Sequence, residues 1–96
     1  MKVVYTEPAL DDLDEITTWL KQNYPGLGRA VERRLKVVVA HIARWPESAR
    51  RSARHPDIRV APLGRYPYKI FYRVTSEAVE ILHIHHAARR PWDERE

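Results

Sequence analysis

Apolar residues recur every three or four positions in two stretches of the first half of the chain. The first stripe consists of Leu10, Leu13, Ile16, Leu20 and Tyr24. The second stripe consists of Val31, Leu35, Val38, Ile42 and Trp45. Because an α-helix turns once in about 3.6 residues, each stripe lies along one side of a helix, and the pattern predicts two amphipathic helices.

Capping and turn-forming residues mark the ends of both predicted helices. Thr6 can cap the first helix, and Pro8 is tolerated in its first turn because its missing N–H would have no intrahelical partner there. Pro25 and Gly26 end this helix, and Pro46 ends the second. The short loop between them predicts an antiparallel helical hairpin.

Four other segments have the composition of β-strands. Lys2–Thr6 is a short β-branched and aromatic run, and Ile58–Leu63 alternates weakly between apolar and polar residues. Tyr68–Val74 alternates clearly, and a short polar loop joins it to Val79–His85, which predicts an antiparallel hairpin. Glu47–Pro56 has no apolar period, and we expect it to be a basic, mobile connection.

The order of these elements predicts an α+β fold with the plan β-α-α-β-β-β. We expect a single domain over residues 1–96, because this length lies near the lower edge of common domain sizes. An antiparallel sheet would carry the N-terminal helical hairpin packed on one face and leave its other face open. Alternation in the central strand predicts Lys69, Phe71 and Arg73 on one face of the sheet.

The composition excludes several classes of protein. With 44% hydrophobic residues the chain is too apolar for wholesale disorder, yet it has no run of about 20 apolar residues that would span a membrane. It has no cysteine, which excludes disulfides, thiolate nucleophiles and cysteine-based zinc sites. Glycine-rich phosphate loops and serine-hydrolase signatures are also absent. The N-terminus does not resemble a secretory signal, so we expect a cytoplasmic protein without membrane association.

Positive charge is concentrated in the middle of the chain. Residues 29–56 carry eight arginines and lysines against two acidic residues, within a chain of formal net charge +4. This distribution favours a face that attracts an acidic partner, which is either nucleic acid or an acidic protein segment. A solvated helix surface rich in arginine explains the same pattern, and charge alone leaves both interpretations open.

Histidines cluster at the end of the last predicted strand. His83 and His85 stand two residues apart and point to one face, as two metal ligands would, but a third ligand would have to come from Asp57 or Glu80. We therefore expect no metal and no cofactor, and we interpret the histidines as solvated groups at a strand end. A general-base role for one histidine is the alternative. Four early carboxylates are interpreted as surface groups that complement the dipole of the first helix: Asp11, Asp12, Asp14 and Glu15.

Cations and aromatic residues are interleaved in the C-terminal half. The cations are Arg65, Lys69, Arg73, Arg89 and Arg90, and the aromatic residues are Tyr66, Tyr68, Tyr72 and Trp92. This mixture suits nucleic acid, where guanidinium groups meet phosphate and rings stack on bases. It suits a protein interface equally well, because arginine, tyrosine and tryptophan are common anchors there.

Three segments, taken in order, carry a resemblance that covers nearly the whole chain. They read YTEPALDDLDEI near the start, GRYPYKIFYRV in the middle and VEILHIHHAARRPW at the end. These segments resemble the ParE/RelE superfamily of toxins from type II toxin–antitoxin systems. The resemblance implies a growth-arresting toxin that a cognate ParD-like antitoxin wraps and neutralises in a toxin–antitoxin hetero-oligomer.

The superfamily has two branches with different targets. RelE-like members are mRNA endonucleases that act on the ribosome, whereas ParE-like members bind and poison DNA gyrase. When the pattern of the nuclease branch is aligned with this chain, Lys69 stands at the position of one charge-stabilising arginine and Arg89 stands near the position of a second. Val60 and Pro62 stand where that branch has paired lysines, and Arg95 stands near its C-terminal tyrosine.

These departures favour the gyrase-binding branch, because cations without proton-transfer groups bind phosphate but move protons poorly. His86 can replace the missing acid/base group, so a nuclease site of Lys69, His86 and Arg89 remains the alternative. The segments GRYPYKIFYRV and AARRPW are more similar to the ParE branch.

The resemblance and the charge pattern together predict two binding surfaces. We expect the target to be bound by Arg65, Lys69, Arg73, Arg89, Arg90 and Trp92. We expect the antitoxin to be bound by the basic side of the second helix, at Arg33, Arg34 and Arg44.

Overall fold

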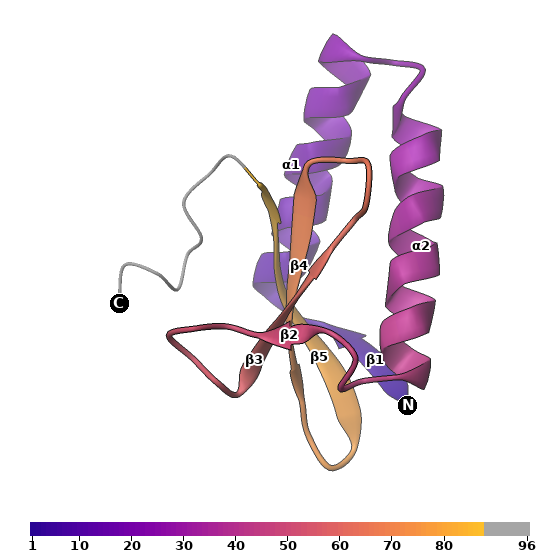
Figure 1. Cartoon of the computed structure of the whole chain (residues 1–96). Coiled ribbons are helices and arrows are strands. Elements are labelled where there is room, and N and C mark those ends of the chain that lie inside the picture. Colours follow the sequence, from indigo (N-terminus) through magenta and orange to yellow (C-terminus); the bar gives the residue numbers. More distant parts are fainter. Residues whose placement is uncertain (88–96) are drawn as a thin grey trace.

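The computed structural model describes residues 1–87, and within them two helices cover one face of a five-stranded sheet (Figure 1). In chain order the elements are β1 (Lys2–Tyr5), α1 (Glu7–Asn23), α2 (Gly28–Arg44), β2 (Arg50–Arg51), β3 (Ile58–Pro62), β4 (Tyr68–Val74) and β5 (Ala78–His86). The helices lie side by side and are joined by a short loop, as the sequence predicts. The α+β class and the helical hairpin on one face of the sheet are confirmed.

The helices end where the capping residues predict. The Thr6 side chain accepts a hydrogen bond from the Ala9 N–H at 3.4 Å, and Pro8 occupies the first turn of α1. At the end of α2 the Trp45 N–H donates to the His41 carbonyl at 2.8 Å, directly before Pro46. Local sequence therefore marks the start of α1 and the end of α2.

The apolar line of α1 that packs on the sheet differs from the predicted stripe. Ala9 and Leu20 are buried, whereas Leu10 and Tyr24, which the stripe includes, are 51% and 55% exposed. The small Ala9 lets the helix approach the sheet closely, and an alanine adds little to an apolar pattern. Trp45 lies beyond the end of α2 and is also exposed.

The sheet has the strand order β1-β5-β4-β3-β2 and contains one parallel pair, β1 with β5. The predicted antiparallel arrangement holds for the other pairs, including the β4–β5 hairpin. The parallel direction brings Thr6 to β5, where its N–H donates to the Ile81 carbonyl at 3.1 Å. The start of α1 is thereby held at the middle of β5.

The segment predicted as a mobile connection contains an additional strand. Arg50 and Arg51 form β2, which pairs with β3. The Arg59 guanidinium donates to the carbonyl of Ala49 at 2.7 Å and to that of Glu47 at 3.0 Å, which ties this segment to the sheet. A strand of two arginines has no apolar alternation and so gives no sequence signal.

The sheet has a different apolar cluster on each face. The larger cluster lies between the sheet and the helices and includes the fully buried Tyr72, Ile70 and Ile81. The Tyr72 hydroxyl donates to the Pro46 carbonyl at 2.8 Å, and burial raises the pKa of this phenol. The smaller cluster consists of Ile58, Val60 and Phe71, with Leu82 packed against it. Neither helix within residues 1–87 has the length and apolar composition that crossing a bilayer requires.

Candidate functional site

The face of the sheet that turns away from the helices, called the open face below, brings Lys69 and His85 together. Lys69 is paired in register with Pro62 on β3 and with His85 on β5. Directly paired residues project to the same face of a sheet, so these three side chains are neighbours. The Phe71 ring packs against His85 with 5.8 Å between ring centroids.

An irregularity in β5 shapes the next part of the open face. Phe71 pairs with His83 while the following Tyr72 pairs with Ile81, so Leu82 is an extra residue in β5. Such a bulge re-aims the side chains around it. Leu82 packs into the small apolar cluster, and His83 lies beside it at the edge of the strand.

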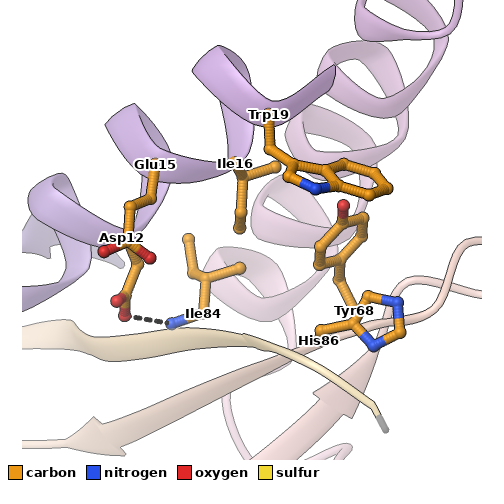
Figure 2. Close-up of a pocket in the computed structure, with 7 residues that line it drawn as sticks. All are labelled: Asp12, Glu15, Ile16, Trp19, Tyr68, Ile84 and His86. Carbon is orange, nitrogen blue, oxygen red and sulfur yellow. Dashed lines mark hydrogen bonds between the residues drawn. The ribbon is translucent and has the colours of Figure 1, made fainter. Parts of the chain in front are cut away.

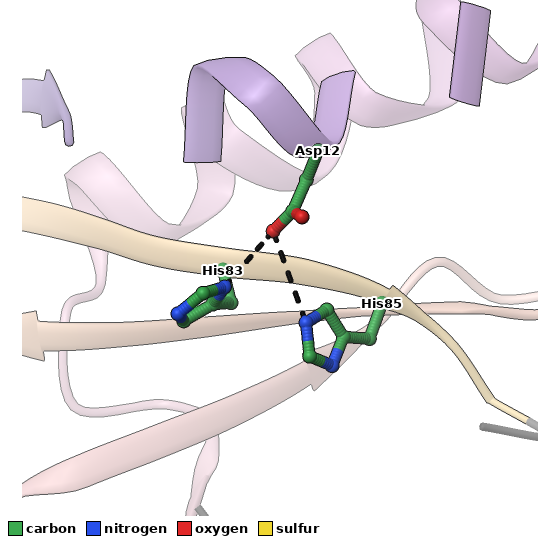
Figure 3. A group of neighbouring side chains, drawn as sticks. All are labelled: Asp12, His83 and His85. Atoms are coloured by element: carbon green, nitrogen blue, oxygen red, sulfur yellow. Dashed lines mark hydrogen bonds and ion pairs between the residues drawn. The ribbon is translucent and has the colours of Figure 1, made fainter. Parts of the chain in front are cut away.

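Asp12 of α1 covers the edge of β5 after β1 has ended. Its Oδ2 accepts a hydrogen bond from the Ile84 N–H at 2.9 Å and lies 3.0 Å from Nδ1 of His83. The same oxygen lies 3.9 Å from Nε2 of His85 (Figure 3). Shielding a backbone N–H from water without giving it an acceptor costs free energy, so Asp12 serves the part-buried Ile84 N–H in place of the absent neighbouring strand.

The sequence-based interpretation of Asp12 as a dipole-compensating surface group misses this role. A usable signal was present, because Asp12 stands three residues after Ala9 and four before Ile16, which is the sheet-facing side of α1. The proposed metal partners for His83 were Asp57 and Glu80, and neither belongs to this cluster.

A hollow of about 460 Å³ lies between α1 and the ends of β4 and β5 (Figure 2). It is lined by Asp12, Glu15, Ile16, Trp19, Tyr68, Ile84 and His86. His86 packs edge-on against the Tyr68 ring at 5.4 Å between centroids, and Trp19 of α1 lies above Tyr68 at the rim. The hollow therefore combines an aromatic wall with the carboxylates of α1.

The structure does not bring His86 and Lys69 together. His86 pairs in register with Tyr68 and lines the hollow under α1, whereas Lys69 points to the open face. The histidine beside Lys69 is His85 instead. Arg89, the third residue of the predicted nuclease site, lies outside the described residues.

Of the other residues predicted to bind a target, Arg73 lies on β4 and Arg65 lies in the turn that precedes it. Arg73 donates to Glu80 Oε1 from Nη2 at 2.9 Å and from Nε at 3.3 Å, so part of its charge is paired on the sheet. Arg65 is exposed in the turn between β3 and β4. Outside the described residues lie Arg89, Arg90 and Trp92.

The basic residues of α2 differ in how they are engaged. Arg33 is exposed, and the Arg44 guanidinium lies over the Trp45 ring at 5.5 Å from its centroid. The Arg34 Nε donates to the Leu63 carbonyl at 3.1 Å, which ties α2 to the end of β3. Arg34 thus has a structural contact in addition to its predicted role in antitoxin binding.

Comparison with known proteins agrees with this architecture. A solved structure described as the chromosomal ParDE toxin–antitoxin system from P. aeruginosa superposes with a TM-score of 0.76 at 24% identity, over 90% of this chain and 95% of that one. The isolated E. coli RelE toxin superposes with a TM-score of 0.69 at 21% identity, over 98% of this chain and 92% of that one. Both branches of the superfamily share this fold.

Sequence comparison gives the same family. The chain is 36% identical over 89 residues to Toxin RelE2 of Caulobacter vibrioides, covering 92% of this chain and 97% of that protein. The family model for the ParE toxin of the type II toxin–antitoxin system parDE matches residues 3–91. The chain therefore belongs to the ParE toxin family of type II toxin–antitoxin systems, within the ParE/RelE superfamily.

Proposed function

We propose that this chain is a growth-arresting toxin that binds and inhibits DNA gyrase and is neutralised by a cognate ParD-like antitoxin. Its family implies an antitoxin partner. The target is the finer part of the proposal, since the superfamily contains both gyrase inhibitors and mRNA endonucleases.

The observation that supports gyrase as target is the composition of the open face around Lys69. The β3 residue paired with Lys69 is Pro62, and Val60 of the same strand is buried in the small apolar cluster. The nuclease branch is expected to have paired lysines at these two positions. Proline and valine side chains neither donate nor accept protons, so β3 contributes no proton-transfer group to this face.

A reconstituted supercoiling reaction tests the proposal directly. Purified toxin is added to gyrase, ATP and relaxed plasmid, and transcripts from induced cells are mapped by primer extension in parallel. We expect supercoiling to fall with toxin concentration, to recover when the antitoxin is added, and transcripts to stay intact. Normal supercoiling together with codon-positioned cuts in mRNA would contradict the proposal.

One pairing in the sheet favours an mRNA endonuclease of the RelE type as the second candidate. Lys69 and His85 are directly paired across β4 and β5, so a cation lies beside an imidazole, the side chain most often used for acid/base catalysis. The relative named Toxin RelE2 points the same way.

Single variants separate the two candidates. If the chain is a nuclease, His85→Ala removes mRNA cleavage and growth arrest, whereas His86→Ala on the opposite face retains both. If the chain inhibits gyrase, transcripts stay intact upon induction of the unmodified toxin and of both variants.

A further inference from the structure

Three side chains with metal-ligating atoms converge where α1 crosses β5 (Figure 3). They are Asp12, His83 and His85, and one ligand atom of each lies within 4.8 Å of those of the other two. Asp12 Oδ2 is the oxygen near both imidazoles, at Nδ1 of His83 and Nε2 of His85. Their side chains are 20%, 24% and 17% exposed, so the cluster is shielded from bulk solvent but reachable by an ion.

The two separations from Asp12 to the imidazoles are close to those that a small ion imposes. Zinc binds nitrogen and oxygen ligands at about 2.0–2.2 Å, so two ligands of a tetrahedral ion lie about 3.3–3.6 Å apart. In the structure Asp12 Oδ2 is 3.0 Å from His83 Nδ1 and 3.9 Å from His85 Nε2. Small rotations of the imidazole rings are sufficient to bring the three atoms around one ion.

The fold orients the ligands before any ion arrives. The Ile84 N–H donates to Asp12 Oδ2 at 2.9 Å, which orients the carboxylate towards β5. His83 and His85 stand two residues apart on β5 and project to the same face, with 5.0 Å between their ring centroids. Hydrogen bonds to ligand groups from outside the ligand set are a regular feature of metal sites, because they fix ligand direction.

We propose that Asp12, His83 and His85 form a three-ligand site for a divalent transition metal of the zinc class, with water at the remaining position. Imidazole donors favour zinc, cobalt, nickel and copper over magnesium and calcium, which prefer all-oxygen sites. Lys69 lies opposite His85 and repels any cation, so affinity comes from the imidazole bonds more than from net charge. The proposal rests on these three side chains and not on gyrase being the target.

Metal binding to the untagged, chelator-treated chain tests the proposal. Isothermal titration with Zn²⁺ is expected to give one ion per chain, and Co²⁺ is expected to give the intense visible absorption of a four-coordinate ion. Zn²⁺ is also expected to raise the thermal midpoint, and a chelator should reverse the rise, because an ion that binds the folded state stabilises it.

Ligand variants and matched controls assign the ion to this cluster. Asp12→Asn, His83→Ala and His85→Ala are each expected to weaken Zn²⁺ binding at least about tenfold and to remove the cobalt absorption. Asp12→Asn keeps an oxygen acceptor for the Ile84 N–H, so it separates ligand loss from unfolding. His86→Ala, the next residue of β5 on the opposite face, should bind zinc as the unmodified chain does.

Three results would overturn the proposal. The first is the absence of zinc binding to the unmodified chain. The second is zinc binding that survives the double variant His83→Ala, His85→Ala. The third is a cobalt spectrum typical of a six-coordinate aqueous ion. Circular dichroism of each variant confirms that a loss of binding is not a loss of fold.

Discussion

Gly64, in the turn between β3 and β4, offers a quantitative test of how α2 is attached to the sheet. Its φ angle is +74°, a left-handed conformation that costs a residue with a Cβ roughly 1–2 kcal/mol. A Cβ added there would also meet the Arg34 guanidinium, whose nearest nitrogen, Nη2, is closer than van der Waals contact allows. Gly64→Ala therefore strains the backbone and displaces Arg34.

Displacing Arg34 breaks its hydrogen bond to the Leu63 carbonyl. Arg34 is an exposed residue and this bond is partly buried, so we use the typical net value for a hydrogen bond, about 1 kcal/mol. The two contributions predict that Gly64→Ala lowers the free energy of unfolding by about 2–3 kcal/mol. In an Arg34→Met background the bond is already lost, so Gly64→Ala should cost only about 1–2 kcal/mol.

Thermal unfolding of the four proteins of this cycle, followed by circular dichroism, measures the coupling. A loss of 1 kcal/mol lowers the thermal midpoint by about 4–8 °C in a domain of this size, so the differences are resolvable. Gly28→Ala is the matched control, because a Cβ there meets nothing within 4 Å and no positive φ is required. We expect no loss of stability from it.

Two outcomes would refute this reasoning. If Gly64→Ala costs the same with and without Arg34, the guanidinium does not lie over the turn. If Gly64→Ala is neutral, the turn does not need a left-handed residue.

Three further predictions concern the antitoxin, the target and pH. In surface plasmon resonance, the affinity for the antitoxin should weaken as salt rises, and Arg33→Ala and Arg44→Ala should each lower the association rate. An affinity independent of salt would contradict the role of these charges. The double variant Arg89→Ala, Arg90→Ala should abolish growth arrest while the thermal midpoint and antitoxin binding stay nearly unchanged; a fully toxic variant would exclude this segment from target recognition. Tyr72→Phe leaves the Pro46 carbonyl without its donor and should cost about 1–3 kcal/mol at neutral pH. Because burial raises the Tyr72 pKa above 10, the stability of the unmodified chain should fall as pH rises past 10, and Tyr72→Phe should lose less over that range in thermal melts.

Much of the fold is predictable because local signals determine it. Pro8, Pro25 and Pro46 mark helix ends, and the alternation within Tyr68–Val74 assigns each residue of β4 to the correct face. The parallel pairing of β1 with β5 is not predictable in this way. This pairing joins Lys2 to Ala78. No local sequence pattern indicates which of two strands so far apart in the chain will become neighbours.

Only some residues of the candidate site could be predicted, because the site joins residues from distant segments of the chain. The histidines of β5 stand out in the sequence, but the carboxylate that contacts them precedes His83 by 71 residues. Residues 88–96, which include Arg89, Arg90 and Trp92, lie outside the described residues, so their assignment to target binding stays a prediction.

The strand β5 itself contains the signal that explains this site. Its apolar residues Val79 and Ile81 alternate regularly, and the next residue on the helix side is Ile84, one position out of phase. An extra residue must therefore lie between Ile81 and Ile84, and the bulge at Leu82 is where the structure accommodates it. Without the bulge, Ile81 and Ile84 would face opposite sides of the sheet. Burial of Ile84 under α1 thus requires the bulge, and the bulge sets His83 at the strand edge where Asp12 reaches it.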